Sequence, residues 1–205
     1  MKRTFVKIVV FAVLLLLILE PFFPPLASSS NNGVSPDITP SLPSYIIHNV
    51  TIVIHNGQNI PTQRPFQQMI IINSSSYSAY ESGNLRNVEF LYHNGSVIPS
   101  WLESGAYNSS FSTVYWLKLD NGIPANSNLS ILLGFASKNT RLMDGITVGE
   151  APGVSHVYGK YDNGANIFRF YDNFSGTSLN GSSWVSNDTI RYVNDGLILN
   201  FQSSG

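Results

Sequence analysis

The fold class of this chain is decided by residues 88–103, VEFLYHNGSVIPSWLE. The Asn-Gly pair in its middle separates two runs of alternating apolar and polar residues. A two-residue type I′ turn favours Asn-Gly because both central residues need positive φ. That turn would place Tyr92 opposite Val97 and Val88 opposite Trp101, with the apolar side chains on one face of the ribbon. Such a face needs a second layer to cover it, so the hairpin predicts an all-β sandwich.

The bulk composition is typical of a β-rich protein from outside the cytoplasm. Of the 205 residues, 11% are charged and 43% are hydrophobic, and cysteine is absent. Amide and hydroxyl groups, instead of charged groups, therefore make up most of the polar surface, and no disulfide contributes to stability. The formal net charge is −1, and it becomes −3 when the basic leader is removed. This balance disfavours a nucleic-acid partner, which requires clustered Lys and Arg.

The N-terminus has the features of a secretion leader. Lys2, Arg3 and Lys7 precede an apolar run over residues 8–19, which is shorter than the roughly 20 residues that span a bilayer as a helix. We predict a signal peptide over residues 1–27. The alternative, an uncleaved membrane-anchor helix over residues 5–26, stays open, and this segment is the only expected contact with a membrane. Both interpretations place the rest of the chain in an extracytoplasmic location, secreted or at the cell surface.

The rest of the chain divides into a linker and two β-rich regions. Residues 28–44, rich in Pro, Ser and Asn, are predicted to be a disordered linker. Residues 45–150 are predicted to form an antiparallel, jelly-roll-like β-sandwich, because period-2 strands alternate there with closely spaced turn signals. Besides the hairpin, its predicted strands are 45–55, 66–72, 111–119 and 129–135, with a short helix or loop at 74–84.

The composition changes at Ala151-Pro152-Gly153, where a second region begins. Residues 168–171 and three short stretches around Trp184, 190–192 and 196–199 are predicted to be strands. About fifty residues without disulfides are too few for an independent sandwich core. We therefore predict that residues 151–205 are the start of a second, truncated β domain.

Several segments of residues 45–136 share the pattern of one known family: 45–54, NLRNVEF (84–90), IPSWLES (98–104), YWLK (115–118) and IPAN (123–126). On these segments the region resembles a β-sandwich module of prokaryotic surface and exported proteins, the domain of unknown function 2341 (DUF2341). In such proteins a concanavalin-like jelly roll often follows, and residues 171–179 with Trp184 resemble its opening. The Asn- and Ser-rich composition is similar to that of archaeal surface proteins.

Recognisable catalytic and metal-binding motifs are missing from the sequence. The chain has no Glu-x-Asp-x-x-Glu run like that of jelly-roll glycosidases, no Gly-x-Ser-x-Gly and no His-Glu-x-x-His. The carboxylates nearest the aromatic residues are Glu89, Glu103 and Asp172, and the first two are interpreted as solvent-facing or rim residues of the hairpin. The sequence therefore predicts no catalytic residue, no cofactor site and no metal ligand.

Three Asp/Asn/Gly clusters allow two interpretations. They would supply oxygen ligands to calcium, or they would form β-turns, and we favour turns because these residues are common turn formers. The clusters are Asp144-Gly145, Asp162-Asn163-Gly164 and Asp172-Asn173.

Aromatic residues in predicted loops are candidates for stacking on sugar rings. Tyr107, Tyr158 and Tyr161 lie in such loops, whereas Trp101 and Tyr115 lie on predicted strands and are interpreted as core. The tyrosines are therefore the candidate glycan-contact residues. Candidate N-glycosylation sites of the form Asn-x-Ser/Thr are Asn49, Asn73, Asn94, Asn108, Asn128, Asn173, Asn180 and Asn187.

These observations favour a non-enzymatic, exported cell-surface module that serves adhesion, glycan contact or envelope architecture. Cell-surface glycans and other envelope proteins are the expected partners. The alternative is an accessory domain of a carbohydrate-active enzyme whose catalytic part lies beyond Gly205.

Overall fold

The computed structural model describes residues 41–185 and 191–199. The predicted leader, the linker up to residue 40 and the candidate acceptor Asn187 lie outside the described residues. Among the residues it describes, no helix is both long enough and apolar enough to cross a membrane.

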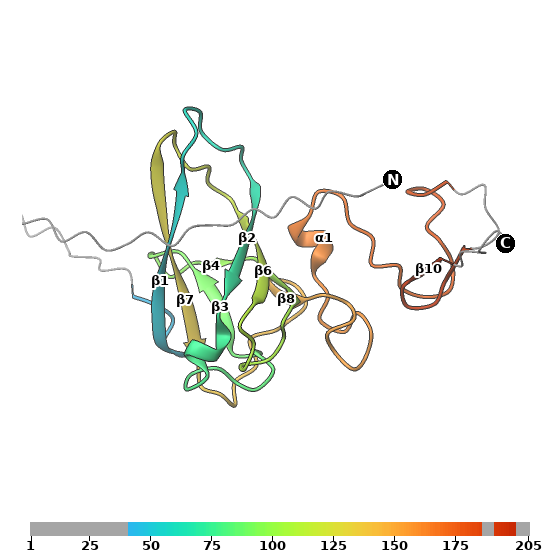
Figure 1. Cartoon of the computed structure of the whole chain (residues 1–205), viewed down its shortest axis with the longest axis horizontal. Helices are drawn as coiled ribbons and strands as arrows, with labels where there is room; N and C mark the ends of the chain where they lie inside the picture. Colours follow the sequence, from blue (N-terminus) through green and yellow to red (C-terminus); the bar gives the residue numbers. More distant parts are fainter. Residues whose placement is uncertain (1–40, 186–190, 200–205) are drawn as a thin grey trace, which may run out of the picture. The chain divides into compact units, whose positions relative to one another are not determined.

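Two four-stranded sheets form the fold, which confirms the predicted all-β sandwich (Figure 1). All neighbouring strands in them are antiparallel except β5 and β8, which run parallel. The first sheet has the order β1 (Ile46–Asn56), β7 (Ser127–Ala136), β3 (Val88–Leu91), β4 (Val97–Ile98). The second has the order β2 (Phe66–Ile72), β6 (Thr113–Leu119), β5 (Ser100–Ser104), β8 (Val148–Glu150). The remaining elements are η1 (Ser74–Tyr77), α1 (Gly164–Ile167) and the hairpin β9 (Arg191–Val193) and β10 (Leu197–Leu199).

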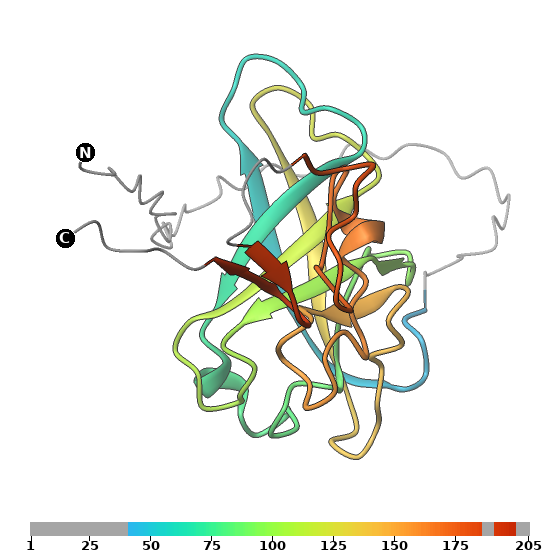
Figure 2. The same cartoon turned by 90° about the vertical axis from the view of Figure 1, so that its right-hand side faces the viewer.

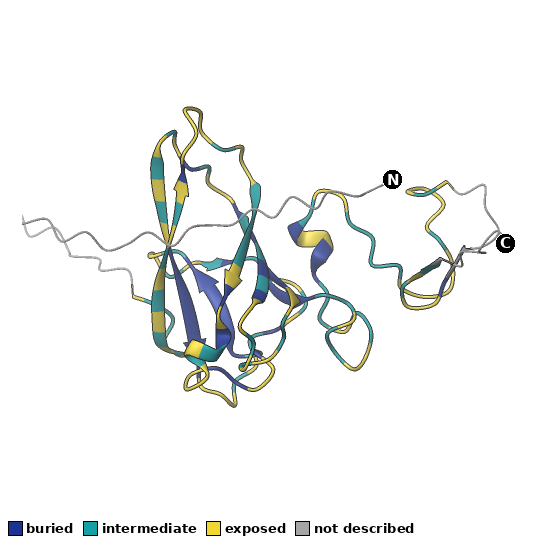
Figure 3. Ribbon diagram, viewed as in Figure 1, coloured by how far each residue is buried: buried dark blue, intermediate teal, exposed yellow. Residues whose placement is uncertain are grey.

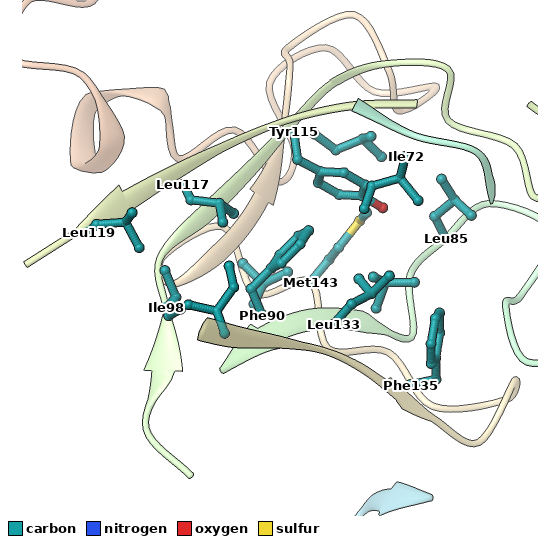
Figure 4. Packing of buried hydrophobic residues seen from close by; sticks show 14 residues of the cluster. Ile72, Leu85, Phe90, Ile98, Tyr115, Leu117, Leu119, Leu133, Phe135 and Met143 are labelled. Atoms are coloured by element: carbon teal, nitrogen blue, oxygen red, sulfur yellow. The ribbon is translucent and has the colours of Figure 1, made fainter. Parts of the chain in front are cut away.

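The core lies between the two sheets. Side chains of β3 and β7 meet those of β6, and the ring of Phe90 on β3 lies 5.1 Å from the ring of Tyr115 on β6, edge to face. Figure 4 shows Phe90 and Leu133 pointing toward Tyr115 and Leu117. The edge strand β1 alternates half-buried and exposed residues, whereas β3 is buried throughout (Figure 3). The period-2 pattern therefore predicted both where β1 lies in the chain and which of its side chains face the core.

The opening hairpin forms, but its predicted register is wrong by one residue. Phe90 pairs with Ile98 and Leu91 with Val97, and the amide of Tyr92 donates to the carbonyl oxygen of Ser96 at 2.9 Å. Residues 93–95 therefore form a three-residue loop instead of the predicted two-residue loop. The amide of Gly95 donates to the carbonyl oxygen of Tyr92 at 2.9 Å, and Gly95 has φ +83°. The loop is therefore a turn followed by one left-handed glycine, which needs positive φ only at the Gly of Asn-Gly.

The predicted pairing of Val88 with Trp101 is also wrong, because the chain changes sheets at Pro99. β4 pairs with β3 in the first sheet, whereas β5 pairs with β6 in the second, where Trp101 lies opposite Trp116. Leu102 faces the core, so the neighbouring Trp101 points to the outer face of the second sheet. The interpretation of Trp101 as buried holds, since it is only 9% exposed, but its partners differ from the predicted ones.

Residues 162–171 cover the outer face of the second sheet. The ring of Phe168 lies 5.2 Å from that of Trp101 and 5.5 Å from that of Trp116. Nε2 of Gln67 on β2 donates to the carbonyl oxygen of Ile167 at 3.0 Å. The helix α1 lies beside the second sheet in both Figure 1 and Figure 2.

The strands predicted at 168–171 and around Trp184 do not form, because these aromatic residues pack on other aromatic side chains instead of joining a sheet. Strands β9 and β10 confirm the stretches predicted at 190–192 and 196–199 over residues 191–192 and 197–199, and residue 190 lies outside the described residues. The boundary predicted at residue 150 and the concanavalin-like character of residues 151–205 stay predictions.

Candidate functional site

The carboxylates singled out in the sequence do not come together. Glu89 lies on β3 of the first sheet and Glu103 on β5 of the second. Oε2 of Glu103 accepts a hydrogen bond from Nε1 of Trp116 at 2.6 Å, and Oδ2 of Asp172 accepts one from Nε1 of Trp184 at 2.7 Å. Glu103 is exposed, but the interpretation of Glu89 as a rim residue is wrong, since it is only 2% exposed.

Burial raises the pKa of Glu89, and a hydrogen bond with Tyr45 partly offsets that rise. Partial desolvation of Tyr45 and its hydrogen bond with Glu89 raise the pKa of Tyr45 to about 12. The carboxyl group of Glu89, on the outer face of β3, is therefore a buried part of the fold and not a surface group.

The predicted turn clusters use their oxygens within the chain. Oδ1 of Asp144 accepts the backbone amides of Ile146, Thr147 and Val148 at 2.8–3.0 Å. Oδ1 of Asp162 accepts Nε1 of Trp101 at 3.0 Å and the hydroxyl of Tyr171 at 2.8 Å. Within residues 41–185 and 191–199, no group of three or more His, Cys, Asp or Glu residues is placed to hold a metal ion.

A cavity of about 380 Å³ brings together two of the three candidate tyrosines. Tyr107, on the loop after β5, is 68% exposed, and Tyr161, on the loop after β8, is partly buried. The third candidate, Tyr158, does not line this cavity, because its hydroxyl donates to the carbonyl oxygen of Asn173. The lining residues are Asn84, Ala106, Tyr107, Arg141, Glu150, Val154, Ser155, His156, Val157, Lys160 and Tyr161.

Two packing features hold Tyr161 at the cavity. The amide of Glu150, at the end of β8, donates to the carbonyl oxygen of Tyr161 at 3.0 Å. The next residue, Asp162, is bound to Trp101 and Tyr171 as described above. The second sheet therefore positions Tyr161, because both the carbonyl group of Tyr161 and the side chain of the next residue are hydrogen-bonded to it.

Charged groups surround Tyr161. The guanidinium carbon of Arg141 lies 4.9 Å from the centroid of its ring, and Nζ of Lys160 lies 5.2 Å from it. Glu150 is 4% exposed, and its carboxylate accepts a hydrogen bond from the hydroxyl of Ser155. Burial raises the pKa of Glu150, while Ser155 and the charge of Arg141 act in the opposite direction.

The sequence did not reveal Arg141, Glu150 or Lys160 as members of this site. Lys160 directly precedes the candidate Tyr161 in the chain, and this pairing of a basic residue with a loop aromatic residue could have pointed to Lys160. Arg141 and Glu150 reach the cavity only through the packing of β8 beside β5, a parallel pairing between segments far apart in the chain. No local pattern predicts such a pairing.

The candidate glycosylation acceptors differ in accessibility. Asn94 lies at the exposed hairpin tip and Asn128 is exposed on β7, which confirms their predicted placement. Nδ2 of Asn173, the atom that a glycan would modify, donates to Oδ2 of Asp162 at 2.8 Å. The exposed acceptors are Asn49, Asn73, Asn94, Asn128 and Asn180, and the partly buried ones are Asn108 and Asn173.

The segments that carried the family resemblance have structural roles. Trp101 of the IPSWLES segment is bound to Asp162, and Asn87 of the NLRNVEF segment is fully buried. Nδ2 of Asn87 donates to the carbonyl oxygens of Tyr80 and Ala136 at 2.9 and 2.7 Å. These segments define a β-sandwich with a covered outer face.

Comparison with known proteins identifies the family. The family described as "Domain of unknown function (DUF2341)" matches residues 84–187, half of the chain. The chain therefore belongs to the DUF2341 family, and the matched region includes residues 162–171 on the second sheet. The chain is also 39% identical over 126 residues to uncharacterized protein 562 of Sulfolobus islandicus rod-shaped virus 1. That match covers 60% of this chain and 21% of the viral protein, so the chain spans about a fifth of its relative's length. No solved structure matches the chain.

Proposed function

We propose that this chain is a non-enzymatic, extracytoplasmic cell-surface module that contacts glycans through the cavity lined by Tyr107 and Tyr161. The observation that carries the proposal is the convergence of these two loop aromatics in one cavity of about 380 Å³. This volume lies within the roughly 300–1,000 Å³ of small-molecule sites. Aromatic rings with a polar edge suit sugars, whose faces are apolar and whose rims carry hydroxyls.

Tyr107 provides the direct test. We expect Tyr107→Ala to weaken binding of cellotetraose or tetragalacturonate to the full chain about fivefold to tenfold, measured by isothermal titration calorimetry. The fold should persist, because the side chain of Tyr107 is 68% exposed. The matched control is Phe111→Ala, which removes a ring that is 79% exposed and lies outside the cavity. Equal losses in the two variants, or no saccharide binding by the unaltered chain, would contradict the proposal.

The extracytoplasmic location rests on the leader and has its own test. We expect the mature protein to begin near residue 28, as read by N-terminal sequencing, because residues 1–27 have the pattern of a signal peptide. An intact Met1 on a membrane-bound protein would favour the anchor interpretation. An intact Met1 on a protein found in the cytoplasm would overturn the location.

The second candidate function is an accessory domain of a carbohydrate-active enzyme. It is favoured by the length of the viral relative, of which the matched region covers only 21%. In that case the longer protein would hydrolyse a polysaccharide, whereas residues 1–205 alone would only bind it. Assaying both on one polysaccharide separates the two candidates.

A further inference from the structure

The cavity combines aromatic rings with more positive than negative groups. Arg141, from the loop between β7 and β8, and Lys160, from the loop after β8, approach the same ring of Tyr161 at 4.9 and 5.2 Å. The two cations come from loops on either side of the strand that ends at Glu150. His156 lines the same cavity.

The one carboxylate among the lining residues, Glu150, interacts with the charge of Arg141, but it is far more buried than the cations. Glu150 is 4% exposed, and the hydroxyl of Ser155 donates to one of its oxygens. By contrast, Arg141 and Lys160 are exposed side chains at the cavity wall. A ligand in the cavity therefore meets the cations more readily than the carboxylate.

From this arrangement we infer that the cavity selects pyranose sugars that carry an anionic substituent, a carboxylate or a sulfate ester. The ring of such a sugar stacks on the exposed face of Tyr107, and its anionic group binds Arg141 and Lys160. This inference rests on the proposed glycan-contact function and names its ligand class. A planar guanidinium binds carboxylate or sulfate oxygens through two parallel hydrogen bonds, and an ammonium group adds a point charge.

Three saccharides of equal length separate the ligand classes. The probes are tetragalacturonate, which carries carboxylates, a sulfated carrageenan tetrasaccharide, and neutral cellotetraose, each titrated calorimetrically into the full chain. We expect at least one acidic probe to bind roughly tenfold more tightly than cellotetraose, because a hydrogen bond to a charged group commonly contributes that much. The tighter of the two acidic probes identifies the anionic group. Added salt should weaken only the acidic probes.

Charge variants test whether the named cations carry the selectivity. Arg141→Gln and Lys160→Gln are each expected to lower affinity for the acidic probe roughly tenfold while changing cellotetraose binding less than about twofold. Arg141→Lys should restore part of the loss. The control Lys138→Gln removes an exposed cation outside the cavity, whose Nζ donates to the carbonyl oxygen of Ser78. The salt dependence of the unaltered chain keeps the test valid if a variant misfolds.

The possible failures are distinguishable. Equal affinity for cellotetraose and the acidic probes, or tighter binding of cellotetraose, would overturn the selectivity and leave the glycan-contact function standing. An equal loss in Lys138→Gln and Arg141→Gln would also overturn it, because it would show only the effect of overall charge. Absence of binding by all three probes would overturn both proposals.

Discussion

Replacing Gly149 with alanine is expected to destabilise the protein by about 3 kcal/mol, measured from the denaturant dependence of unfolding. A Cβ at this position on β8 would lie 2.1 Å from Oδ1 of Asn163 and 2.6 Å from the carbonyl oxygen of Tyr161. Neither atom has room to move freely. Nδ2 of Asn163 donates to the carbonyl oxygens of Ser100 and Thr147 at 3.1 and 3.2 Å, and Asn163 is 3% exposed.

The expected loss combines overpacking with broken hydrogen bonds. Relieving the contact requires Asn163 to leave the backbone carbonyls that it joins, and each such bond contributes about 0.5–1.5 kcal/mol. The matched control is Gly153→Ala, because a Cβ at Gly153 meets nothing within 4 Å. That variant should remain within about 0.5 kcal/mol of the unaltered chain.

A double-mutant cycle identifies the cause. In an Asn163→Ala background, Gly149→Ala should cost less than it does alone, because the closest clash is gone. Equal stabilities of the Gly149→Ala and Gly153→Ala proteins would show that residues 161–163 do not pack on β8 as described. Additive losses in the double variant would show that the two residues do not interact.

Local patterns predicted the strands because sheet burial imposes a period of two. The predicted strands 45–55, 66–72, 111–119 and 129–135 each correspond to an observed strand, although β1 begins at Ile46 and β6 at Thr113. β6 alternates as expected of an interior strand. The hairpin register was missed because Asn-Gly suits two turn types. In the observed one only Gly95 takes positive φ, and Oδ1 of Asn94 instead accepts the amide of Ser96 at 3.0 Å.

The candidate site shows the same limit at longer range. Tyr107 and Tyr161 were predicted as ligand contacts because their turn-rich surroundings indicated loops, but nothing local indicated that they share a cavity. Their proximity depends on the sheet change at Pro99 and on the parallel pairing of β5 with β8. Trp101 likewise was expected opposite Val88, and its actual partner, Asp162, is sixty-one residues away in the chain.

The second large effect is a loss of stability as pH rises. Glu81 is 1% exposed, and burial raises the pKa of its carboxyl from 4.5 to about 7, against a small opposite effect of its hydrogen bond with Ser74. Oε2 of Glu81 and the hydroxyl of Tyr115 both lack hydrogen-bond partners among the described residues. A carboxylate there would be desolvated with only the hydrogen bond from Ser74 to offset the cost, so the folded chain favours its protonated form.

The direction of the pH effect follows from proton binding. Between pH 4.5 and about 7 the folded state retains a proton on Glu81 that the unfolded state has lost. The free energy of unfolding therefore falls as pH rises through this window, by at most about 3 kcal/mol from this group. Burial also raises the pKa of Glu89 and of Glu150, so both add to the fall in the same direction.

Glu81→Gln isolates the contribution of this carboxyl. The variant should unfold with a shallower pH dependence than the unaltered chain, because Gln cannot take up or release a proton. Its stability relative to the unaltered chain should improve between pH 4.5 and roughly pH 8, measured by guanidinium unfolding in matched buffers. The comparison of slopes is insensitive to any fixed cost of placing the Gln amide beside Tyr115.

The control Glu103→Gln removes an exposed carboxylate, so it reports the loss of a negative charge without the loss of a buried carboxyl. Identical slopes for the Glu81→Gln protein and the unaltered chain would contradict the assignment. Such a result would mean that Glu81 is hydrated in solution, because only water beside its carboxylate removes the desolvation that raises its pKa. A rise in stability from pH 4.5 to about 7 would reverse the expected sign and would require that ion pairs of the folded chain outweigh all three buried carboxyls.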